Sequence, residues 1–324
     1  MALSSDRLAK LVGGELLRAT GACPKRAIHD SRRVEHGDLF VALPGHRTDG
    51  HLHVADAFER GACAALVSDV SRLPDEAHDV IWVSDPLSAL QTWAADHRQR
   101  LTGDCIGITG TNGKTTVKRM LRHFLEDHLR TYAAPHNYNT EIGLPLALLS
   151  MPADAHVGLF ELGTEHPGDI HTLAQILRPS GAVLTSVGPG HLEGLGTVEQ
   201  VAAEKWSLVE SLPPSATAIL SAESPHLLQR ASRARCRTLT VGFSQGDVRA
   251  RLLHTTPIQI ELSEEQVTLR APLLGEHNGL NLLLASVTAR ELGVPWALIK
   301  EKANTLSAEP HRLQLPTAPF GRLL

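Results

Sequence analysis

The stretch Gly107-Ile-Thr-Gly-Thr-Asn-Gly-Lys-Thr-Thr116 connects an apolar strand, residues 105–109, to a helix that begins near Lys114. A glycine-rich turn between a strand and a helix suits a phosphate, because glycine lets the backbone approach the anion and the helix N-terminus presents free amides. Lys114 adds positive charge, and Thr115 offers a hydroxyl to a phosphate-bound Mg²⁺. The stretch therefore predicts a phosphate-binding loop, although Ile108 stands where the common loop has its first glycine.

Regular alternation of strands and helices follows this loop and predicts a mainly parallel sheet with right-handed crossovers. The alternating segments 258–262 and 266–269 predict antiparallel strands appended to that sheet. The predicted fold class is therefore α/β, with a small N-terminal α/β domain before a P-loop domain. The strands of the parallel sheet are expected at residues 105–109, 131–134, 157–161, 182–187, 217–221 and 238–243.

The first 85 residues form a separate unit in this interpretation, with strands and helices but no nucleotide loop of their own. Polar residues crowd two of its predicted loops, around Ser31 and around Arg47. These loops either bind a ligand or simply face water. The predicted boundaries are residues 1–85 for the N-terminal domain, 86–310 for the central domain and 311–324 for the start of a further domain.

Charge and composition exclude several classes of protein. The net charge is −4 and no basic tract is present, which argues against nucleic acid as the main partner. No apolar run approaches the length needed to span a bilayer, and the N-terminus lacks the pattern of a secretory signal. The four cysteines are scattered, as is usual in a reducing compartment. A cytoplasmic protein without a membrane partner is expected.

Two polar side chains follow strands whose carboxyl ends should lie near the phosphate loop. Glu161 ends the strand at 157–161, and His191 lies in the glycine-rich loop after the next strand. Ligands of such sheets bind at the carboxyl ends of the strands. Either residue alone has a structural alternative, a helix cap for Glu161 and loop ordering for His191. Together with the loop they predict a Mg²⁺ site, because oxygen ligands suit this cation.

Lys205 is unusual because it falls on the apolar face of a helix predicted at residues 197–212, between Val201 and Leu208. A buried ammonium is costly, so this lysine must be paired, extend its charged end to solvent, or be chemically altered. Reaction with CO₂ would give an anionic carbamate able to bind a metal. The spacing alone does not choose among these possibilities.

Six motifs in order resemble those of the Mur ligases, the ATP-dependent amide ligases of peptidoglycan precursor synthesis. Within that family the chain looks most like the members that add D-alanyl-D-alanine to UDP-N-acetylmuramoyl-tripeptide. The shifted glycine of the phosphate loop is the form that this family uses. The motifs are Asp30-Ser-Arg32 with Gly37–Gly45 and Asp49-Gly50, Gly107–Thr116, Asn137–Pro145, Glu161-Leu-Gly163, His191–Gly194 and Gly275–Asn278.

The resemblance implies a role for each matching residue. It implies that Lys114 and Thr115 contact the γ-phosphate and Mg²⁺, that Glu161 and His191 hold a second metal ion, and that Lys205 is carbamylated. Catalytic residues would be Lys114, Lys205 and His191, and metal ligands Thr115, Glu161, His191 and carbamylated Lys205. ATP would be bound by Gly110, Thr111, Asn112, Gly113, Lys114, Thr115, Thr116, Asn278 and Arg312, although Asn278 is equally an ordinary helix cap. The acceptor substrate would be bound by Ser31, Arg47, Asn137, Asn139 and Thr140.

The implied reaction joins a carboxylate to an amine through an acyl phosphate, with ATP and Mg²⁺ as cofactors and release of ADP and phosphate. The implied partners are the small molecules UDP-N-acetylmuramoyl-peptide and D-alanyl-D-alanine, and a monomer is expected. A non-catalytic ATP-binding protein derived from such a ligase is one alternative. A ligase for a related acid, such as a folate, is another, although the Asp-Ser-Arg motif argues against it.

Members of the family continue into a third domain that closes over ATP. This sequence ends in an apolar run, residues 320–324, that resembles the start of a strand. A fragment of a longer ligase, inactive by itself, is therefore expected rather than a natural two-domain protein.

Overall fold

The computed structural model describes residues 3–45, 48–74, 78–135, 137–190, 192–262 and 265–307. Its contacts divide the chain into two compact units. Unit 1 comprises residues 1–101 together with 137–152, and unit 2 comprises residues 102–136 together with 153–324. Each unit is described by itself.

Unit 1 contains a sheet of strand order β1-β5-β4-β3-β2, in which β2 to β5 are parallel and β1 is antiparallel. Its central strands are almost wholly apolar and buried, as expected when helices cover both faces of a sheet. The strands are β1 (Glu15–Arg18), β2 (Ala27–Ile28), β3 (Leu39–Val41), β4 (Ala64–Val67) and β5 (Asp79–Trp82). The helices are α1 (Ser5–Leu11), η1 (Ser31–Arg33), η2 (Gly50–His53), α2 (Val54–Glu59), α3 (Pro86–Arg100) and α5 (Gly143–Leu149).

Two segments outside the predicted N-terminal domain belong to unit 1. Helix α3, capped by the Asp85 side chain, packs against α5, and Gln91 Nε2 donates a hydrogen bond to the Glu141 carbonyl oxygen at 3.2 Å. The compact unit therefore ends at Leu101 and takes in residues 137–152. The predicted boundary at residue 85 separates a substrate-binding domain from an ATP-binding domain, and this division stays a prediction.

A buried carboxylate ties the start of unit 1 to its sheet. Asp79, at the beginning of β5, is fully buried and accepts hydrogen bonds from the backbone amides of Thr20 and Ala22, the latter at 2.9 Å. Burial alone would raise the pKa of Asp79, but the hydrogen bonds from Thr20, Ser5 and Ala22 together hold it below its usual value. The ionised carboxylate therefore stabilises this part of the fold.

Asp79→Asn should destabilise unit 1 by about 2 kcal/mol at pH 7, because two backbone amides lose a charged acceptor. The pKa of Asp79 is lower in the folded protein than in the unfolded chain, so the ionised carboxylate stabilises the fold at any pH above the unfolded pKa. This stabilisation is lost as the pH falls through the pKa of the folded protein. The difference between wild type and variant should therefore shrink below about pH 4. Hydrogen exchange of the β5 amides at pH 7 and at acid pH measures this difference in stability. Asp6→Asn, at an exposed helix position, is the matched control and should change little; an equal effect of both variants would contradict the prediction.

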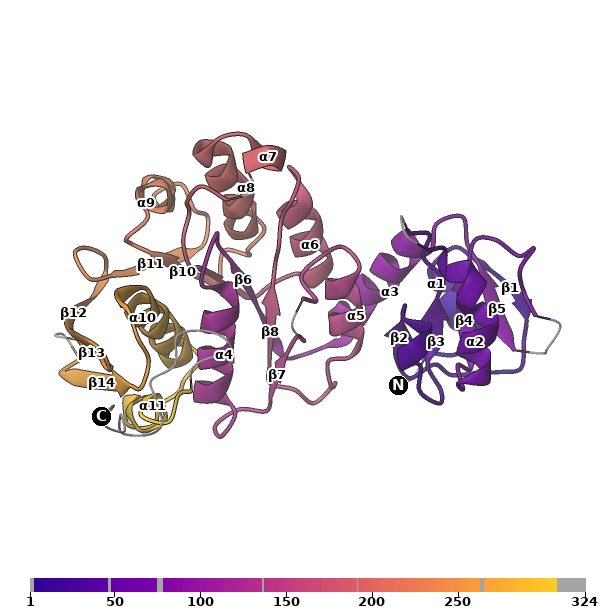
Figure 1. Cartoon of the computed structure of the whole chain (residues 1–324), viewed down its shortest axis with the longest axis horizontal. Helices are drawn as coiled ribbons and strands as arrows, with labels where there is room; N and C mark the ends of the chain where they lie inside the picture. The colour runs from indigo at the N-terminus through magenta and orange to yellow at the C-terminus, as the bar shows by residue number, and fades with distance from the viewer. Residues whose placement is uncertain are drawn as a thin grey trace, which may run out of the picture. The chain divides into compact units, whose positions relative to one another are not determined.

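Unit 2 is built on a mainly parallel sheet (Figure 1). Among its described residues the strand order is β14-β13-β12-β11-β10-β9-β6-β8-β7, parallel from β12 to β7 and antiparallel through β12, β13 and β14. The predicted α/β fold with appended antiparallel strands is confirmed. The strands are β6 (Asp104–Thr109), β7 (Thr131–Ala133), β8 (Val157–Glu161), β9 (Gly181–Leu184), β10 (Thr217–Ser221), β11 (Arg237–Gly242), β12 (Val248–Thr255), β13 (Ile258–Leu262) and β14 (Val267–Ala271).

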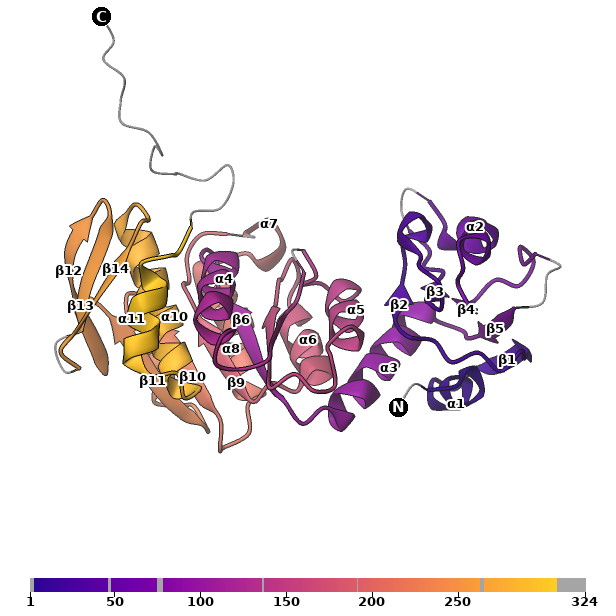
Figure 2. The ribbon, with the colours of Figure 1, turned by 90° about the horizontal axis from the view of Figure 1, so that it is seen from below.

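Helices pack against both faces of this sheet. On one face α4 and α10 lie side by side with α11 next to them (Figure 2), and on the other α8 packs on β6 and β9. Successive residues of β6 face opposite sides of the sheet, which explains the two helix layers. Ile106 and Ile108 belong to the core beneath α4. Gly107 faces α8 so closely that a Cβ on Gly107 would lie 2.9 Å from Leu208 Cδ1. The helices are α4 (Lys114–Leu125), α6 (Asp169–Leu177), α7 (Leu192–Leu195), α8 (Val198–Glu210), α9 (Pro225–Ala231), α10 (Glu276–Glu291) and α11 (Trp296–Ala303).

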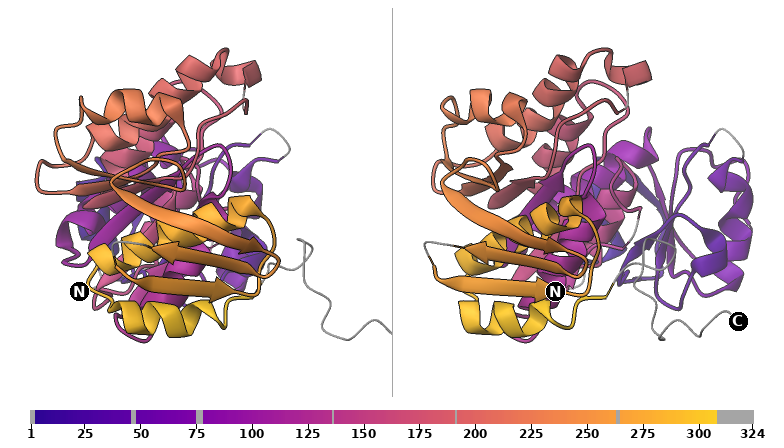
Figure 3. Two further views of the ribbon diagram at one scale, coloured as in Figure 1. Left: turned by 90° about the vertical axis from the view of Figure 1, so that its left-hand side faces the viewer. Right: turned by 60° about the vertical axis from the view of Figure 1, so that its left-hand side comes forward.

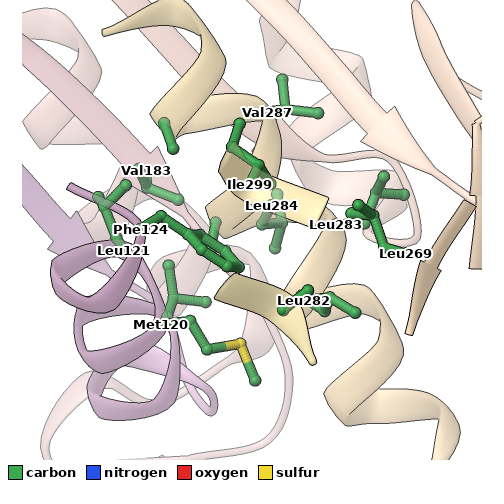
Figure 4. Close-up of a cluster of buried hydrophobic side chains, with 14 of the residues drawn as sticks. Met120, Leu121, Phe124, Val183, Leu269, Leu282, Leu283, Leu284, Val287 and Ile299 are labelled. Atoms are coloured by element: carbon green, nitrogen blue, oxygen red, sulfur yellow. The ribbon is translucent and has the colours of Figure 1, made fainter. Parts of the chain in front are cut away.

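One core of unit 2 forms where α4 meets α10. Figure 4 shows this cluster, and its labelled residues include Met120, Leu121 and Phe124 of α4, Leu282, Leu283 and Leu284 of α10, and Ile299 of α11, all of them fully buried. The antiparallel strands β12 to β14 stack beside these helices (Figure 3), with α10 against β13 and α11 against β14. This packing fixes the start of α4, which carries the phosphate loop.

None of the helices within the described ranges combines the length and the apolar character that a membrane crossing requires.

Candidate active site

The phosphate loop turns into α4 at Gly113, which is the N-cap residue of that helix. Gly113 has φ +87°, a conformation that favours glycine, and a Cβ at this position would lie 2.5 Å from Asn281 Oδ1. The loop therefore needs glycine here for two independent reasons, its backbone conformation and the close approach of α10. Asn281, which the sequence analysis did not identify, is buried and lies beside the loop.

The loop is also held by the residues after β9. The Thr111 amide donates to the Ser186 carbonyl oxygen at 3.0 Å, the Asn112 amide donates to Ser186 Oγ at 3.0 Å, and Thr185 Oγ1 donates to the Asn112 carbonyl oxygen. These contacts correct the strand predicted at 182–187, because β9 ends at Leu184 and the next two residues turn to hold the loop. Thr185 and Ser186 were not identified from the sequence, although hydroxyl residues directly after a strand at this edge are a usable signal.

Lys114 begins α4 and folds back over the loop. Its Nζ donates to the Gly110 carbonyl oxygen at 2.6 Å and reaches the Thr111 carbonyl oxygen at 3.5 Å. Burial lowers the pKa of Lys114, and the nearby Glu161 carboxylate partly offsets that effect. The ammonium is thus held over the loop, where a phosphate would meet it. Thr116, in the first turn of α4, is buried.

Thr115 and Glu161, both predicted metal ligands, are brought together. Thr115 Oγ1 donates to Glu161 Oε2 at 3.0 Å, and the Glu161 side chain is buried at the end of β8. Glu161 Oε1 accepts no well-directed hydrogen bond within the described part of the chain, although Lys118 Nζ lies 2.8 Å away as an ion pair. A hydroxyl and a carboxylate at the mouth of a phosphate loop fit Mg²⁺, which takes oxygen ligands and usually shares them with phosphates.

Lys205 lies on the buried face of α8, as the sequence predicted, and is only 1% exposed. Burial, with a further contribution from the charge of Lys114, lowers the pKa of Lys205 to about 8. No ion pair joins Lys205 to another residue of the described ranges. Of the alternatives left open, a side chain that reaches solvent and a simple ion pair are both disfavoured, and the chemically altered lysine stays a prediction.

Glu204, which precedes Lys205 in α8, forms hydrogen bonds to the start of another helix. Its carboxylate accepts hydrogen bonds from the amides of Gly168 at 2.8 Å and Ile170 at 2.7 Å, at the start of α6. The negative charge therefore satisfies free amides at a helix N-terminus, where the helix dipole also favours an anion. Glu204 thereby fixes α8 to α6, and with it the position of Lys205.

Glu204→Gln should lower the free energy of unfolding of unit 2 by about 2 kcal/mol, because two helix N-terminal amides, of which that of Ile170 is buried, lose their charged acceptor. Hydrogen exchange of α6 amides is the direct measurement. Glu210→Gln, an exposed glutamate on the same helix, is the matched control and should leave α6 protected. Equal protection of α6 in both variants would show that Glu204 is not a cap.

Asn278, the predicted adenine contact, lies in the first turn of α10. Its Nδ2 donates to the Leu274 carbonyl oxygen at 2.8 Å, and its Oδ1 lies 3.5 Å from Asn281 Nδ2. The side chain is half-buried. Asn278 thus lies next to Asn281, whose side chain abuts Gly113, so the start of α10 and the phosphate loop are parts of one site.

The predicted substrate contacts that are described belong to unit 1. Ser31 is almost buried in the short helix η1, whose N-cap is the Asp30 side chain. Thr140 Oγ1 accepts a hydrogen bond from the amide of Gly143, the first residue of α5, at 3.2 Å. Tyr138 OH lies 3.4 Å from Arg33 Nη1, which links the segment 137–140 to η1. Asn137, with φ +69°, and Asn139 lie in the same segment.

Three predicted residues, Arg47, His191 and Arg312, lie outside the described residues. The roles predicted for them stay predictions. Over the described ranges, no group of three or more His, Cys, Asp or Glu side chains could hold a metal ion by itself. Of the predicted metal ligands the structure describes Thr115, Glu161 and Lys205, and it joins Thr115 to Glu161 by a hydrogen bond.

Comparisons with known proteins identify the family of this chain. Residues 108–289 match the Mur ligase middle domain, and residues 28–98 match the Mur ligase family catalytic domain. The chain is 33% identical over 318 residues to the UDP-N-acetylmuramoyl-tripeptide–D-alanyl-D-alanine ligase of Bacillus subtilis, covering 95% of this chain and 69% of that protein.

Solved structures give the same result. A crystal structure of MurF from Acinetobacter baumannii has a TM-score of 0.87 and 27% identity, covering 98% of this chain and 72% of that one. MurF ligase from Thermotoga maritima in complex with ADP has a TM-score of 0.79 and 28% identity, covering 90% of this chain and 68% of that one. The predicted resemblance is confirmed, and the chain belongs to the Mur ligase family.

Proposed function

We propose that the protein is an ATP-dependent amide ligase that adds D-alanyl-D-alanine to UDP-N-acetylmuramoyl-tripeptide and releases ADP and phosphate. The observation that carries the proposal is a phosphate loop with the half-buried Lys114 held over it and the Thr115–Glu161 pair beside it, in a chain similar to ligases of that name. The chain spans 69% of the Bacillus subtilis relative, so the activity is assigned to the protein encoded by the whole reading frame.

The chain's own residues divide the work between binding and charge neutralisation. Lys114, with the loop residues Gly110 to Thr116, would bind the ATP phosphates, and Asn278 and Arg312 would hold the nucleoside. Thr115 and Glu161 would hold Mg²⁺, which neutralises phosphate charge when bound, and Glu161 would share a second metal ion with His191. Lys205 as a carbamate would add an anion to this site. Partial recovery of a Lys205→Ala variant by acetate is the test for that carbamate.

The reaction must activate a carboxylate, which is a poor acylating agent. A carboxylate oxygen of the tripeptide attacks the γ-phosphorus, the bond to the β-phosphate oxygen breaks, and ADP leaves. The amine of D-alanyl-D-alanine then attacks the acyl phosphate carbonyl, and the tetrahedral intermediate expels inorganic phosphate. Lys114, whose Nζ is held at the phosphate loop by the Gly110 carbonyl oxygen, would neutralise charge that builds up on the transferred phosphoryl group, so its contribution would be electrostatic and orientational.

The acceptor substrate would be bound by the N-terminal domain, residues 1–85, and by the segment around Asn139. Ser31, Arg47, Asn137, Asn139 and Thr140 are the residues that we assign to it. Both substrates and ATP are small molecules of the cytoplasm, where we place the reaction, and we propose that the protein acts as a monomer.

The deciding experiment incubates the protein, expressed from its whole reading frame, with Mg²⁺-ATP, UDP-N-acetylmuramoyl-tripeptide and D-alanyl-D-alanine. ADP release should depend on both other substrates, and mass spectrometry should show the UDP-linked pentapeptide. ATP binding without turnover would favour a non-catalytic protein. Product with a folate acceptor instead would favour a ligase for a related acid.

A further inference from the structure

Lys118 is a second buried lysine close to the proposed metal site, and neither the sequence analysis nor the proposed mechanism uses it. It lies one helical turn after Lys114 on α4 and is 6% exposed, although lysines are rarely buried unless they are paired. Its Nζ lies 2.8 Å from Glu161 Oε1, and the two side chains are 8% and 7% exposed. The ion pair is therefore largely removed from solvent.

Three elements meet at the Lys118 ammonium. The Lys118 side chain extends from α4, and its Nζ faces Glu161 at the end of β8. The same Nζ donates a hydrogen bond, at 2.8 Å, to the carbonyl oxygen of Ala134, just after β7. A flexible lysine stem held at two points keeps its charge in one place. Lys118 is thus a fixed cation at the carboxyl edge of the sheet.

The two oxygens of Glu161 have different neighbours. Oε1 faces Lys118, whereas Oε2 accepts the hydroxyl hydrogen bond of Thr115 at the phosphate loop. Lys118 therefore orients the carboxylate so that Oε2 is on the loop side. It also offsets the negative charge that would otherwise attract a free cation to the Thr115–Glu161 pair.

We propose that Lys118 is a positioning residue that makes metal binding at Thr115 and Glu161 depend on the nucleotide. With Lys118 in place, the Thr115–Glu161 pair offers Mg²⁺ one hydroxyl and one carboxylate whose charge is already balanced. The phosphate oxygens must then supply the remaining ligands and the missing negative charge, as is usual for Mg²⁺. The site thus admits the metal as a metal–nucleotide complex rather than alone. This inference rests on the metal–nucleotide site of the proposed function.

The test measures Mn²⁺ binding, with and without ADP, by electron paramagnetic resonance, so that it does not depend on turnover. Wild type should bind Mn²⁺ weakly without ADP and more tightly with it. Lys118→Gln keeps a donor for the Ala134 carbonyl oxygen but removes the charge, and should bind Mn²⁺ without ADP about ten-fold more tightly than wild type. Lys118→Arg keeps the charge and should behave as wild type.

Further controls separate this role from a purely structural one. The gain in Lys118→Gln should disappear in the double variant with Glu161→Gln, because the metal then has no carboxylate. Hydrogen exchange of α4 verifies that each variant is folded. A folded Lys118→Gln protein whose ADP-free affinity for Mn²⁺ equals or falls below that of wild type overturns the inference, while the proposed function stands if Mn²⁺-ADP still binds. Wild type that binds neither ADP nor Mn²⁺-ADP overturns both.

Discussion

Replacing Lys114 with alanine should lower the rate of ADP formation by a factor of about 10³, with a smaller loss of ATP affinity. Lys114 Nζ is held over the loop by the carbonyl oxygen of Gly110. Burial, which lowers the pKa of Lys114, also removes the water that would screen its charge. Charge that develops on the transferred phosphoryl group is therefore stabilised more strongly than charge on ground-state ATP, and kcat should fall more than 1/KM.

Two controls sharpen this prediction. Lys300→Ala removes an exposed lysine from α11 and should leave kcat unchanged. Lys114→Arg keeps the charge, but the planar guanidinium cannot take the place of a compact ammonium beside Gly110, so little activity should return. Steady-state ADP release at saturating substrates is the measurement. A Lys114→Ala variant with more than a tenth of the wild-type kcat would exclude the lysine from phosphoryl transfer.

Local features of this site could be predicted from the sequence. The glycine-rich turn between β6 and α4 is encoded in ten consecutive residues, and its conformation depends mostly on them. The burial of Lys205 follows from the helical spacing of Val201 and Leu208, which the structure confirms. Glu161 could be placed at the end of its strand because the strand is short, apolar and followed by glycine.

Features that depend on strand order could not be predicted in this way. Thr185 and Ser186 hold the phosphate loop only because β9 lies next to β6, although the bonded groups are 73 and 74 residues apart along the chain. Asn281 reaches Gly113 only because α10 packs beside α4. Lys118 lies between Val117 and Arg119, and the sequence analysis gave it no role. The position of β7 and β8 beneath α4 is what buries it.

Lys205→Met should raise the free energy of unfolding of unit 2 by about 3 kcal/mol at pH 7, in buffers free of CO₂, while abolishing product formation. The pKa of Lys205 falls from 10.5 to about 8 in the folded protein because burial and the charge of Lys114 disfavour the ammonium. At pH 7 the folded protein therefore holds an unfavourable charge that the unfolded chain hydrates freely. Methionine has a similar length and no charge, so it removes this cost and keeps the packing.

The pH dependence distinguishes this explanation from a general gain in packing. Between about pH 8 and 10.5 the unfolded chain binds more protons at Lys205 than the folded protein, so wild-type stability should rise with pH across this window. The Lys205→Met variant should lack that rise, and its advantage should vanish above the window. Hydrogen exchange of α8 at pH 7 and pH 10 provides the measurement, with the neighbouring exposed Glu210→Gln as a control. A variant less stable than wild type at pH 7 would mean that Lys205 is already neutral or carbamylated there, and that the lysine is retained for its chemistry without a cost to the fold.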